Sequence, residues 1–205
     1  MTEAEIDKAL DDNDWYAIRH FAITKPNASP DNISKALNDK SSYVREAAIN
    51  HPNASPANID KALSDNNSNV RYYASKHKNA TEENIDKALS DIVEFVKTAA
   101  IRNPNATEEN INTALDDKSE SVRRIAIKYK NVTEANINKA LSDKSEAVRR
   151  IAIRNPNASP NNINKALDDD NIKVKLAAMN HPNASISNKE KAYNDPELIS
   201  YLLKH

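Results

Sequence analysis

Apolar residues recur along the chain in a pattern that repeats every 26 residues. Each copy begins with Ile or Val followed by Arg or Lys, and an alanine lies four residues after that opening. Apolar residues at this spacing predict a helix of about two turns, as in VRRIAIR from Val148 to Arg154. The small alanine allows a neighbouring helix to approach closely. The openings are Ile18, Val44, Val70, Val96, Val122, Val148 and Val174.

A turn follows each opening segment. In Asn155-Pro156-Asn157 the proline disfavours a helical conformation in the residue before it, so the first helix is expected to end there. Asparagine tolerates positive φ better than other residues with a side chain. In a chain without glycine, we expect the second Asn to take the role of glycine at this corner. This Asn recurs in all seven copies, at Asn27, Asn53, Asn79, Asn105, Asn131, Asn157 and Asn183.

A second helix is predicted after the turn. Ser or Thr stands two residues after the turn Asn, at the position of an N-cap, and another Asn follows it three residues later, where a capping box is completed. Ile, Ala and Leu then recur at helical spacing, as in Ile59, Ala62 and Leu63. The helix is expected to end near a recurring aspartate, at Asp39, Asp65, Asp91, Asp117, Asp143, Asp169 and Asp195.

Each repeat therefore predicts a helical hairpin with one apolar side. A two-turn helix is not stable alone in water, so the hairpins must stack on one another. We expect an all-α, right-handed α-solenoid, a superhelix of seven two-helix repeats over residues 18–195, starting at 18, 44, 70, 96, 122, 148 and 174. Residues 1–17 and 196–205 are predicted to be its N- and C-terminal caps within a single solenoid domain.

The pattern VRxxAxxNPNAxPxxIxxALxD, which covers residues 18–195, resembles the leucine-rich repeat variant, whose units pair an α-helix with a short 3₁₀-type helix. The units here are longer than is usual in that family, and this chain has no cysteine for the family's iron–sulfur domain. The spacing from Asp117 to Val122 and Arg123 is also similar to HEAT repeats. That resemblance implies a concave side lined by the Val-Arg helices.

The HEAT resemblance further implies a structural ladder of Asp and Arg side chains between repeats, with pairs such as Asp39 with Arg45. The residues that it assigns to this ladder are Arg45, Arg71, Arg123, Arg149, Asp39, Asp65, Asp117 and Asp143.

Composition excludes several classes of chemistry. Without cysteine the chain can form no disulfide, thiolate metal site or iron–sulfur cluster. Without glycine it has no glycine-rich phosphate-binding loop. The N-terminus does not have the pattern of a secretory signal, and no segment approaches the roughly 20 apolar residues that cross a bilayer. We expect a soluble, cytoplasmic protein with no membrane partner.

The formal net charge of −1 conceals a segregation of charge. The first ten residues of the seven repeats hold 16 of the 29 Lys and Arg residues but only one acidic residue, Glu46. Residues two and six positions after each opening share a helix face. This face is a candidate binding surface for an anionic partner, or else a solvated face that balances acidic neighbours. Its candidate residues are Tyr72, Lys76, Arg102, Arg124, Lys128, Lys130, Arg150 and Arg154.

No group of residues indicates catalysis. His51, His77 and His181 occupy the same position before the turn, one to a repeat, and we expect structural roles for them rather than metal binding. Acidic pairs such as Asp11-Asp12 fall at predicted helix ends. We therefore expect no enzyme, no metal and no cofactor.

Two hypotheses for function remain open at this point. The first is a non-enzymatic scaffold that holds a protein or peptide along the Val-Arg helices. The second is a nucleic-acid-binding solenoid, because HEAT-like arrays in some alkylpurine DNA glycosylases cradle a duplex on a basic concave face. The basic segregation favours this second class, whereas the near-zero net charge disfavours it.

Overall fold

The computed structural model describes residues 1–13 and 15–204, so Asp14 and His205, which belong to the predicted caps, lie outside the described residues. All regular secondary structure in the described part is α-helical. The chain forms two compact units, which we call unit 1 (Met1–Ala106) and unit 2 (Thr107–His205).

Among the described residues, each unit contains eight helices. Unit 1 contains α1 (Glu3–Ala9), α2 (Tyr16–Ile23), α3 (Pro30–Ala36), α4 (Ser42–Ile49), α5 (Pro56–Ala62), α6 (Ser68–Ser75), α7 (Glu82–Leu89) and α8 (Glu94–Ile101). Unit 2 contains α9 (Glu108–Leu115), α10 (Glu120–Ala126), α11 (Glu134–Ala140), α12 (Glu146–Ile153), α13 (Pro160–Leu167), α14 (Ile172–Met179), α15 (Ile186–Tyr193) and α16 (Pro196–Leu202).

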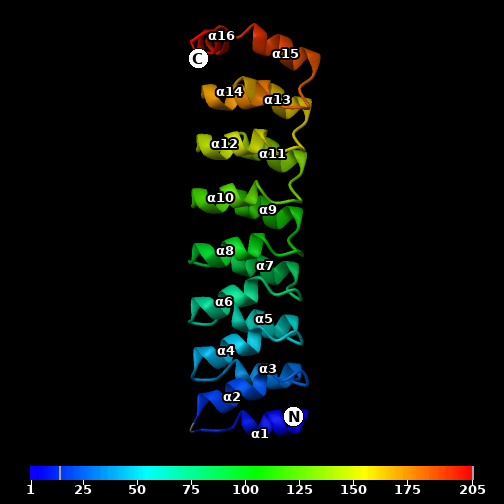
Figure 1. Ribbon diagram of the computed structural model, residues 1–205, viewed down its shortest axis with the longest axis vertical. Coiled ribbons are helices and arrows are strands. Elements are labelled where there is room, and N and C mark those ends of the chain that lie inside the picture. Colours follow the sequence, from blue (N-terminus) through cyan, green and yellow to red (C-terminus); the bar gives the residue numbers. More distant parts are fainter. Residues whose placement is uncertain (14, 205) are drawn as a thin grey trace. The chain divides into compact units, whose positions relative to one another are not determined.

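The helices of each unit form two layers (Figure 1). In unit 1 the even-numbered helices pack in sequence, α2 on α4, α4 on α6 and α6 on α8, and the odd-numbered helices from α1 to α7 do the same. In unit 2 one layer runs from α10 to α16 and the other from α9 to α15. We call the layer that holds the Val-Arg segments the opening layer and the other layer the second layer. Stacked helix pairs of this kind are an α-solenoid fold.

Both helices of each pair are α-helices, in place of the short 3₁₀-type partner that the family resemblance implies. The predicted N-cap residues explain where the helices of the second layer begin. The Ser55 hydroxyl accepts from the backbone N–H of Asn58, while the Asn58 side chain accepts from the N–H of Ser55. Such a reciprocal capping box satisfies two N–H groups that a helix start leaves unpaired. The box recurs at α3, α7, α9, α11, α13 and α15.

The core lies between the two layers. In the repeat that opens at Val44, the opening helix contributes Val44, Ala48 and Ile49 and the second helix contributes Ile59, all fully buried. The small Ala48 lets the helices approach, and the branched residues fill the space between them. Truncating one such isoleucine to alanine would cost about 2–5 kcal/mol.

An Arg–Asp ladder joins neighbouring repeats, but its pairing differs from the predicted one. The predicted pairing of Arg45 with the Asp39 carboxylate is wrong. Both carboxylate oxygens of Asp39 instead accept hydrogen bonds from Arg19 and from the backbone N–H of Ser41. Arg45 instead donates Nη1 to the Asp39 carbonyl at 2.8 Å and pairs with the carboxylate of Asp65, 20 residues downstream.

This pairing recurs through both units. Arg123 is typical: its Nε and Nη2 donate to the Asp143 carboxylate at 2.6 and 3.0 Å, and its Nη1 donates to the Asp117 carbonyl at 2.9 Å. Both side chains are more than nine-tenths buried. The remaining carboxylate pairs are Arg71 with Asp91, Arg149 with Asp169 and Lys175 with Asp195. A guanidinium that binds one carboxylate and one carbonyl ties three segments together.

The ladder sets the protonation of its members. The Asp143 carboxylate, as hydrogen-bond acceptor, raises the pKa of Arg123 despite the opposing effect of burial. Burial alone would raise the pKa of Asp39, but the Arg19 guanidinium and the Ser41 N–H outweigh it and hold that pKa below its usual value. Both groups are therefore charged across the neutral range.

The turns carry a second ladder, and here the positive-φ prediction is wrong: no described residue with a side chain has positive φ. The turn Asn acts through its side chain instead. The Nδ2 of Asn53 donates to the carbonyls of Pro26 and Ala28 at 3.2 and 2.9 Å, in the turn of the preceding repeat. Asn79, Asn105 and Asn183 make the same pair of bonds. These amides satisfy carbonyl groups that a turn would otherwise leave unpaired.

The residue two positions before the turn Asn extends this ladder. The ring of His77 lies between the carbonyl of His51, 3.2 Å from Nε2, and the N–H of Asn79, which donates to Nδ1 at 3.1 Å. Because Nδ1 accepts, Nε2 carries the proton and donates. In the next repeat Asn103 makes equivalent bonds, donating to the carbonyl of His77 and accepting from the N–H of Asn105.

The second layer has its own cross-repeat contacts. Lys61 Nζ donates to the Ser34 carbonyl at 2.8 Å, and Lys87 does the same to the carbonyl and carboxylate of Asp60. In unit 2, Lys139 and Lys191 reach Asp116 and Asp168 in the same way. These four lysines of the second layer are thus engaged with neighbouring repeats, whereas several cations of the opening layer are not.

Candidate binding surface

The eight candidate residues are divided between the units: Tyr72, Lys76 and Arg102 belong to unit 1, and the other five belong to unit 2. In unit 2, Arg124 lies within α10, Lys128 and Lys130 follow its end, Arg150 lies within α12, and Arg154 is the C-cap of α12. All are exposed except Arg150, which is half-buried. Arg124 and Arg150 occupy equivalent positions of two repeats, and so do Lys128 and Arg154. Because α10 packs on α12, these four residues lie on one side of unit 2.

The four cations of this face, Arg124, Lys128, Arg150 and Arg154, are two spaced pairs on adjacent helices. We call them the basic quartet. Lys128 and Arg154 make no ion pair or side-chain hydrogen bond with any described residue. Their charges are therefore available to a ligand, at the cost of little more than displaced water.

Two glutamates in the first helical turns partly neutralise the other two cations of the quartet, and neither glutamate belongs to the predicted site. Glu120 Oε1 lies 3.9 Å from Arg124 Nη1, and Glu146 Oε1 lies 2.9 Å from Arg150 Nη1. The latter oxygen is buried and receives no aligned hydrogen bond within the described structure, so the contact is one of charge alone. Both acids stand two residues before the opening valine. Both glutamates are visible in the sequence, but the charge count over the first ten residues of each repeat starts at the valine and therefore leaves them out.

In unit 1 the equivalent positions of the repeats are aromatic rather than densely basic. Tyr72 of α6 packs edge-on against Tyr73 and Phe95, with ring centroids 5.3 and 5.8 Å apart. The ammonium of Lys76, at the end of α6, lies 5.3 Å from the Tyr72 ring centroid, in the range of a cation–π contact. Arg102 is the exposed C-cap of α8, which packs on α6.

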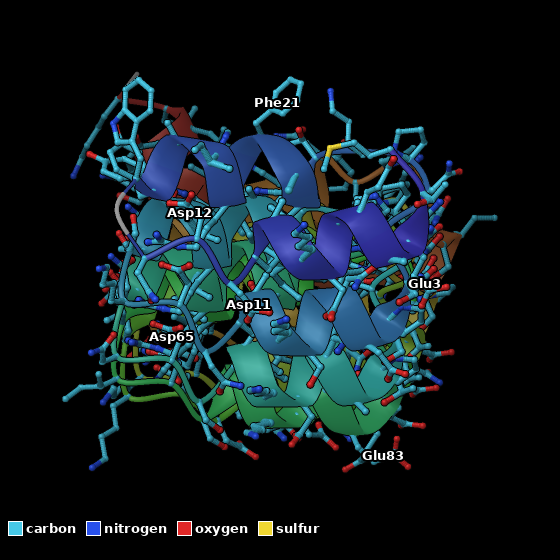
Figure 2. All side chains as sticks on the ribbon, turned by 90° about the horizontal axis from the view of Figure 1, so that it is seen from below. Glu3, Asp11, Asp12, Phe21, Asp65 and Glu83 are labelled. Atoms are coloured by element: carbon cyan, nitrogen blue, oxygen red, sulfur yellow. The ribbon has the colours of Figure 1, made fainter. Side chains whose placement is uncertain are left out.

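Further aromatic residues are exposed nearer the N-terminus. Phe21 points away from α2 in Figure 2 and is contacted by the ammonium of Lys25 at 3.4 Å. Tyr16 and Tyr43 lie with ring centroids 6.1 Å apart. Trp15, which precedes α2, has 63% of its surface exposed and therefore takes little part in covering the core.

A groove opens between α12 and α14 on the same side of unit 2. It has a volume of about 380 Å³, within the range of ligand-binding pockets. Its lining residues are Arg150, Arg154, Lys173, Leu176, Ala177, Asn180, His181 and Pro182. Lys173 and Leu176 lay outside the predicted site, because Lys173 precedes the opening valine and Leu176 is apolar.

No site for a metal ion is formed among the described residues, since their His, Asp and Glu side chains nowhere gather in threes at ligating distances. The described helices also include none with the length and apolar character needed to cross a membrane. The candidate histidines instead bond to backbone groups: His181 Nε2 lies 3.1 Å from the carbonyl of Asn155, and His51 Nε2 lies 3.0 Å from that of Lys25.

Stacked helix pairs, cross-repeat ladders and a variable exposed side define a helical-repeat protein of the α-solenoid class. A solved structure described as a leucine-rich repeat variant with a novel repetitive motif superposes with a TM-score of 0.67. Its sequence is 18% identical, and the match covers 98% of this chain and 80% of that one. The chain thus has the α-solenoid fold of a leucine-rich repeat variant.

Two other solved structures match more weakly. The Escherichia coli protein YibA has a TM-score of 0.45 at 14% identity, covering all of this chain and 92% of that one. A designed armadillo repeat protein has a TM-score of 0.33 at 19% identity, covering 85% and 96%. No family model matches the sequence, and neither does any curated protein.

Proposed function

We propose that this protein is a non-enzymatic binding scaffold that holds an anionic protein or peptide on the opening layer. The observation that carries the proposal is the basic quartet in unit 2: four cations at equivalent positions of two packed helices, two of them without a partner in the described structure. Exposed cations attract an anionic partner over a distance and then form charge-assisted hydrogen bonds with it.

The contrast with the second layer supports this assignment. Lysines of that layer are used to bridge repeats, as Lys139 does to Asp116 and Lys191 to Asp168. The Arg–Asp ladder uses the buried arginines in the same way. The quartet takes part in neither of these bridges between repeats, which supports an external partner for its charges.

A charge-reversal experiment tests the proposal. The variant Arg124→Glu, Lys128→Glu, Arg150→Glu and Arg154→Glu is compared with wild type in pull-downs from the native host, followed by binding measurements on the purified partner. The matched control reverses four exposed lysines elsewhere in unit 2: Lys118, Lys144, Lys189 and Lys204. We expect the quartet variant to lose the partner and the control to retain it. Equal recovery by both would contradict the proposal.

A nucleic acid is the second candidate partner, and the aromatic cluster of unit 1 favours it. Tyr72 and Phe95 expose ring surface beside Lys76, and base stacking on aromatic rings next to cations is a common mode of single-strand binding. Gel shifts with single- and double-stranded oligonucleotides at low salt decide this, since such binding weakens steeply as salt rises. Absence of any shift at low salt rejects this class.

A further inference from the structure

The groove between α12 and α14 combines two kinds of chemistry. Arg150, Arg154 and Lys173 surround it with positive charge, and Leu176 and Ala177 give it an apolar floor. Neither Arg154 nor Lys173 has a side-chain ion pair among the described residues. A site of this composition suits a ligand that carries negative charge next to an apolar group.

The groove lies where the cations at two repeat positions, two and six residues after the opening valine, stop. Two positions after the opening valine, the residues on α10, α12 and α14 are Arg124, Arg150 and Leu176. Six positions after it, they are Lys128, Arg154 and Asn180. A ligand that follows these equivalent positions along unit 2 thus meets cations on two helices and then an apolar residue on the third.

Helix spacing fixes the period of such a ligand. Packed helices lie about 8–10 Å apart. An extended peptide of the polyproline II type advances about 3.1 Å per residue and makes one turn every three residues, so its side chains three positions apart lie on the same side. One helix of the opening layer therefore corresponds to about three residues of an extended peptide that crosses the layer.

Building on the proposed scaffold function, we infer that the groove is a specificity subsite for an extended acidic peptide. Acidic residues three positions apart lie over α10 and α12, and an apolar residue three positions further on enters the groove over Leu176. A peptide is favoured over a nucleic acid strand at this point, because the lining offers aliphatic contacts at Leu176 and Ala177 and no Phe, Tyr or Trp on which a base could stack.

Labelled synthetic peptides test this inference by fluorescence anisotropy with the full chain. One peptide carries two glutamates three residues apart with a leucine three residues beyond, in a neutral soluble background, and a second has the reverse order. Each is matched by a peptide with alanine in place of the leucine and by one with the leucine moved by one residue. We expect one order to bind about five- to tenfold more tightly than both of its matched peptides, from partial burial of the leucine.

A protein variant locates the effect. Leu176→Ala should weaken binding of the leucine peptide by a similar factor and leave the alanine peptide unchanged. Leu202→Ala, which removes an exposed leucine of α16 outside the groove, should change neither. Circular dichroism confirms that both variants fold, and the comparison between peptides on wild-type protein does not depend on any variant.

The outcomes separate the subsite from the scaffold function. If leucine and alanine peptides bind equally in both orders, and the quartet variant binds neither, the subsite is wrong and the anionic-partner proposal stands. If no acidic peptide binds the wild-type protein, both are overturned. If an oligonucleotide binds more tightly than every peptide and ignores Leu176→Ala, the peptide assignment is also overturned.

Discussion

At the scale of single residues, the ring of His77 bridges two backbone groups, with one nitrogen as hydrogen-bond donor and the other as acceptor. Its two ring nitrogens satisfy the His51 carbonyl and the Asn79 N–H, and the amide of Asn103 does the same in the next repeat. His and Asn are interchangeable here because both place a donor and an acceptor on one rigid planar group.

This equivalence predicts an asymmetric response to substitution. His77→Asn should retain both bonds and change the free energy of unfolding little, whereas His77→Ala should cost about 1–3 kcal/mol because two buried backbone groups lose their partners. Urea unfolding monitored by circular dichroism measures both. An alanine variant as stable as the asparagine variant would show that these bonds contribute nothing.

A pH dependence follows from the same residue. Burial lowers the pKa of His77 below its ordinary value of 6.5, against the opposing effect of the hydrogen bond to the His51 carbonyl and with a smaller contribution from the charge of Lys78. Above that value the ring is neutral in both states. As pH falls below about 6.5 the unfolded chain binds the proton first, so stability decreases toward the lower folded pKa.

Urea midpoints at pH 7.5 and 5.5 should therefore differ for the wild type, and the difference should be smaller in His77→Asn, which has no titrating group at this position. The two proteins are compared over the same pH interval, so contributions from other groups cancel. An identical pH dependence in the two proteins would contradict this role of His77.

Sequence alone anticipated that the recurring histidines and turn asparagines are structural, but not how they act. Positive φ was a reasonable expectation for Asn53 in a chain without glycine, and it is wrong because the turn closes with ordinary backbone angles. What fixes this asparagine is a bond to the preceding repeat. A contact between residues 25 apart leaves no trace in the local sequence except recurrence itself.

At the scale of helices, the Arg–Asp ladder ties the opening helix of one repeat to the aspartate near the end of the same repeat and to a carbonyl near the end of the preceding one. Arg123 and Asp143 are both nearly buried, so removal of one partner leaves the charge of the other buried and unpaired. Breaking such a pair from one side costs about 3–5 kcal/mol.

We expect Arg123→Ala to lower the stability of unit 2 by this order, and Arg123→Lys to be much milder. The chain itself shows that a lysine can make this pair, because Lys175 occupies the equivalent position and pairs with Asp195 at 2.8 Å. Thermal unfolding of the two variants, with Arg124→Ala as an exposed control on the same helix, measures the difference. A loss in Arg123→Ala no larger than in the control would show that the ladder is not stabilising.

Helices and caps were the part of the fold that sequence predicted best. The spacing of Ser55 and Asn58 alone predicts the capping box of α5, and the apolar residues between Val148 and Arg154 predict α12. The ladder was foreseen but paired with the wrong carboxylate, because a recurring Asp lies near an Arg both six residues after it and 20 residues before it. Only coordinates separate the two.

At the scale of the whole chain, each kind of cross-repeat bond joins residues at a constant separation. The ladder arginine Arg123 reaches a carbonyl 6 residues back, the turn asparagines reach 25 and 27 residues back, and the ring of His77 reaches 26 residues back. Each repeat thus offers the next one the same set of donors and acceptors. Stability in such an array is approximately a sum over repeats and the interfaces between neighbours.

A duplicated repeat tests this account. Inserting a second copy of residues 148–173 after position 173 adds 26 residues and gives every donor in unit 2 its equivalent acceptor again. We expect the extended protein to fold and to unfold at a urea concentration equal to or above that of the wild type, because one interface has been added. The control carries the same insertion with one extra alanine inside its opening helix, after the residue equivalent to Val148. That alanine rotates the following side chains by about 100° on the helix and turns its ladder arginine away from the carboxylate. The control should therefore unfold earlier than the wild type. Equal stability of the two insertions would mean that constant spacing between repeats does not hold the stack together.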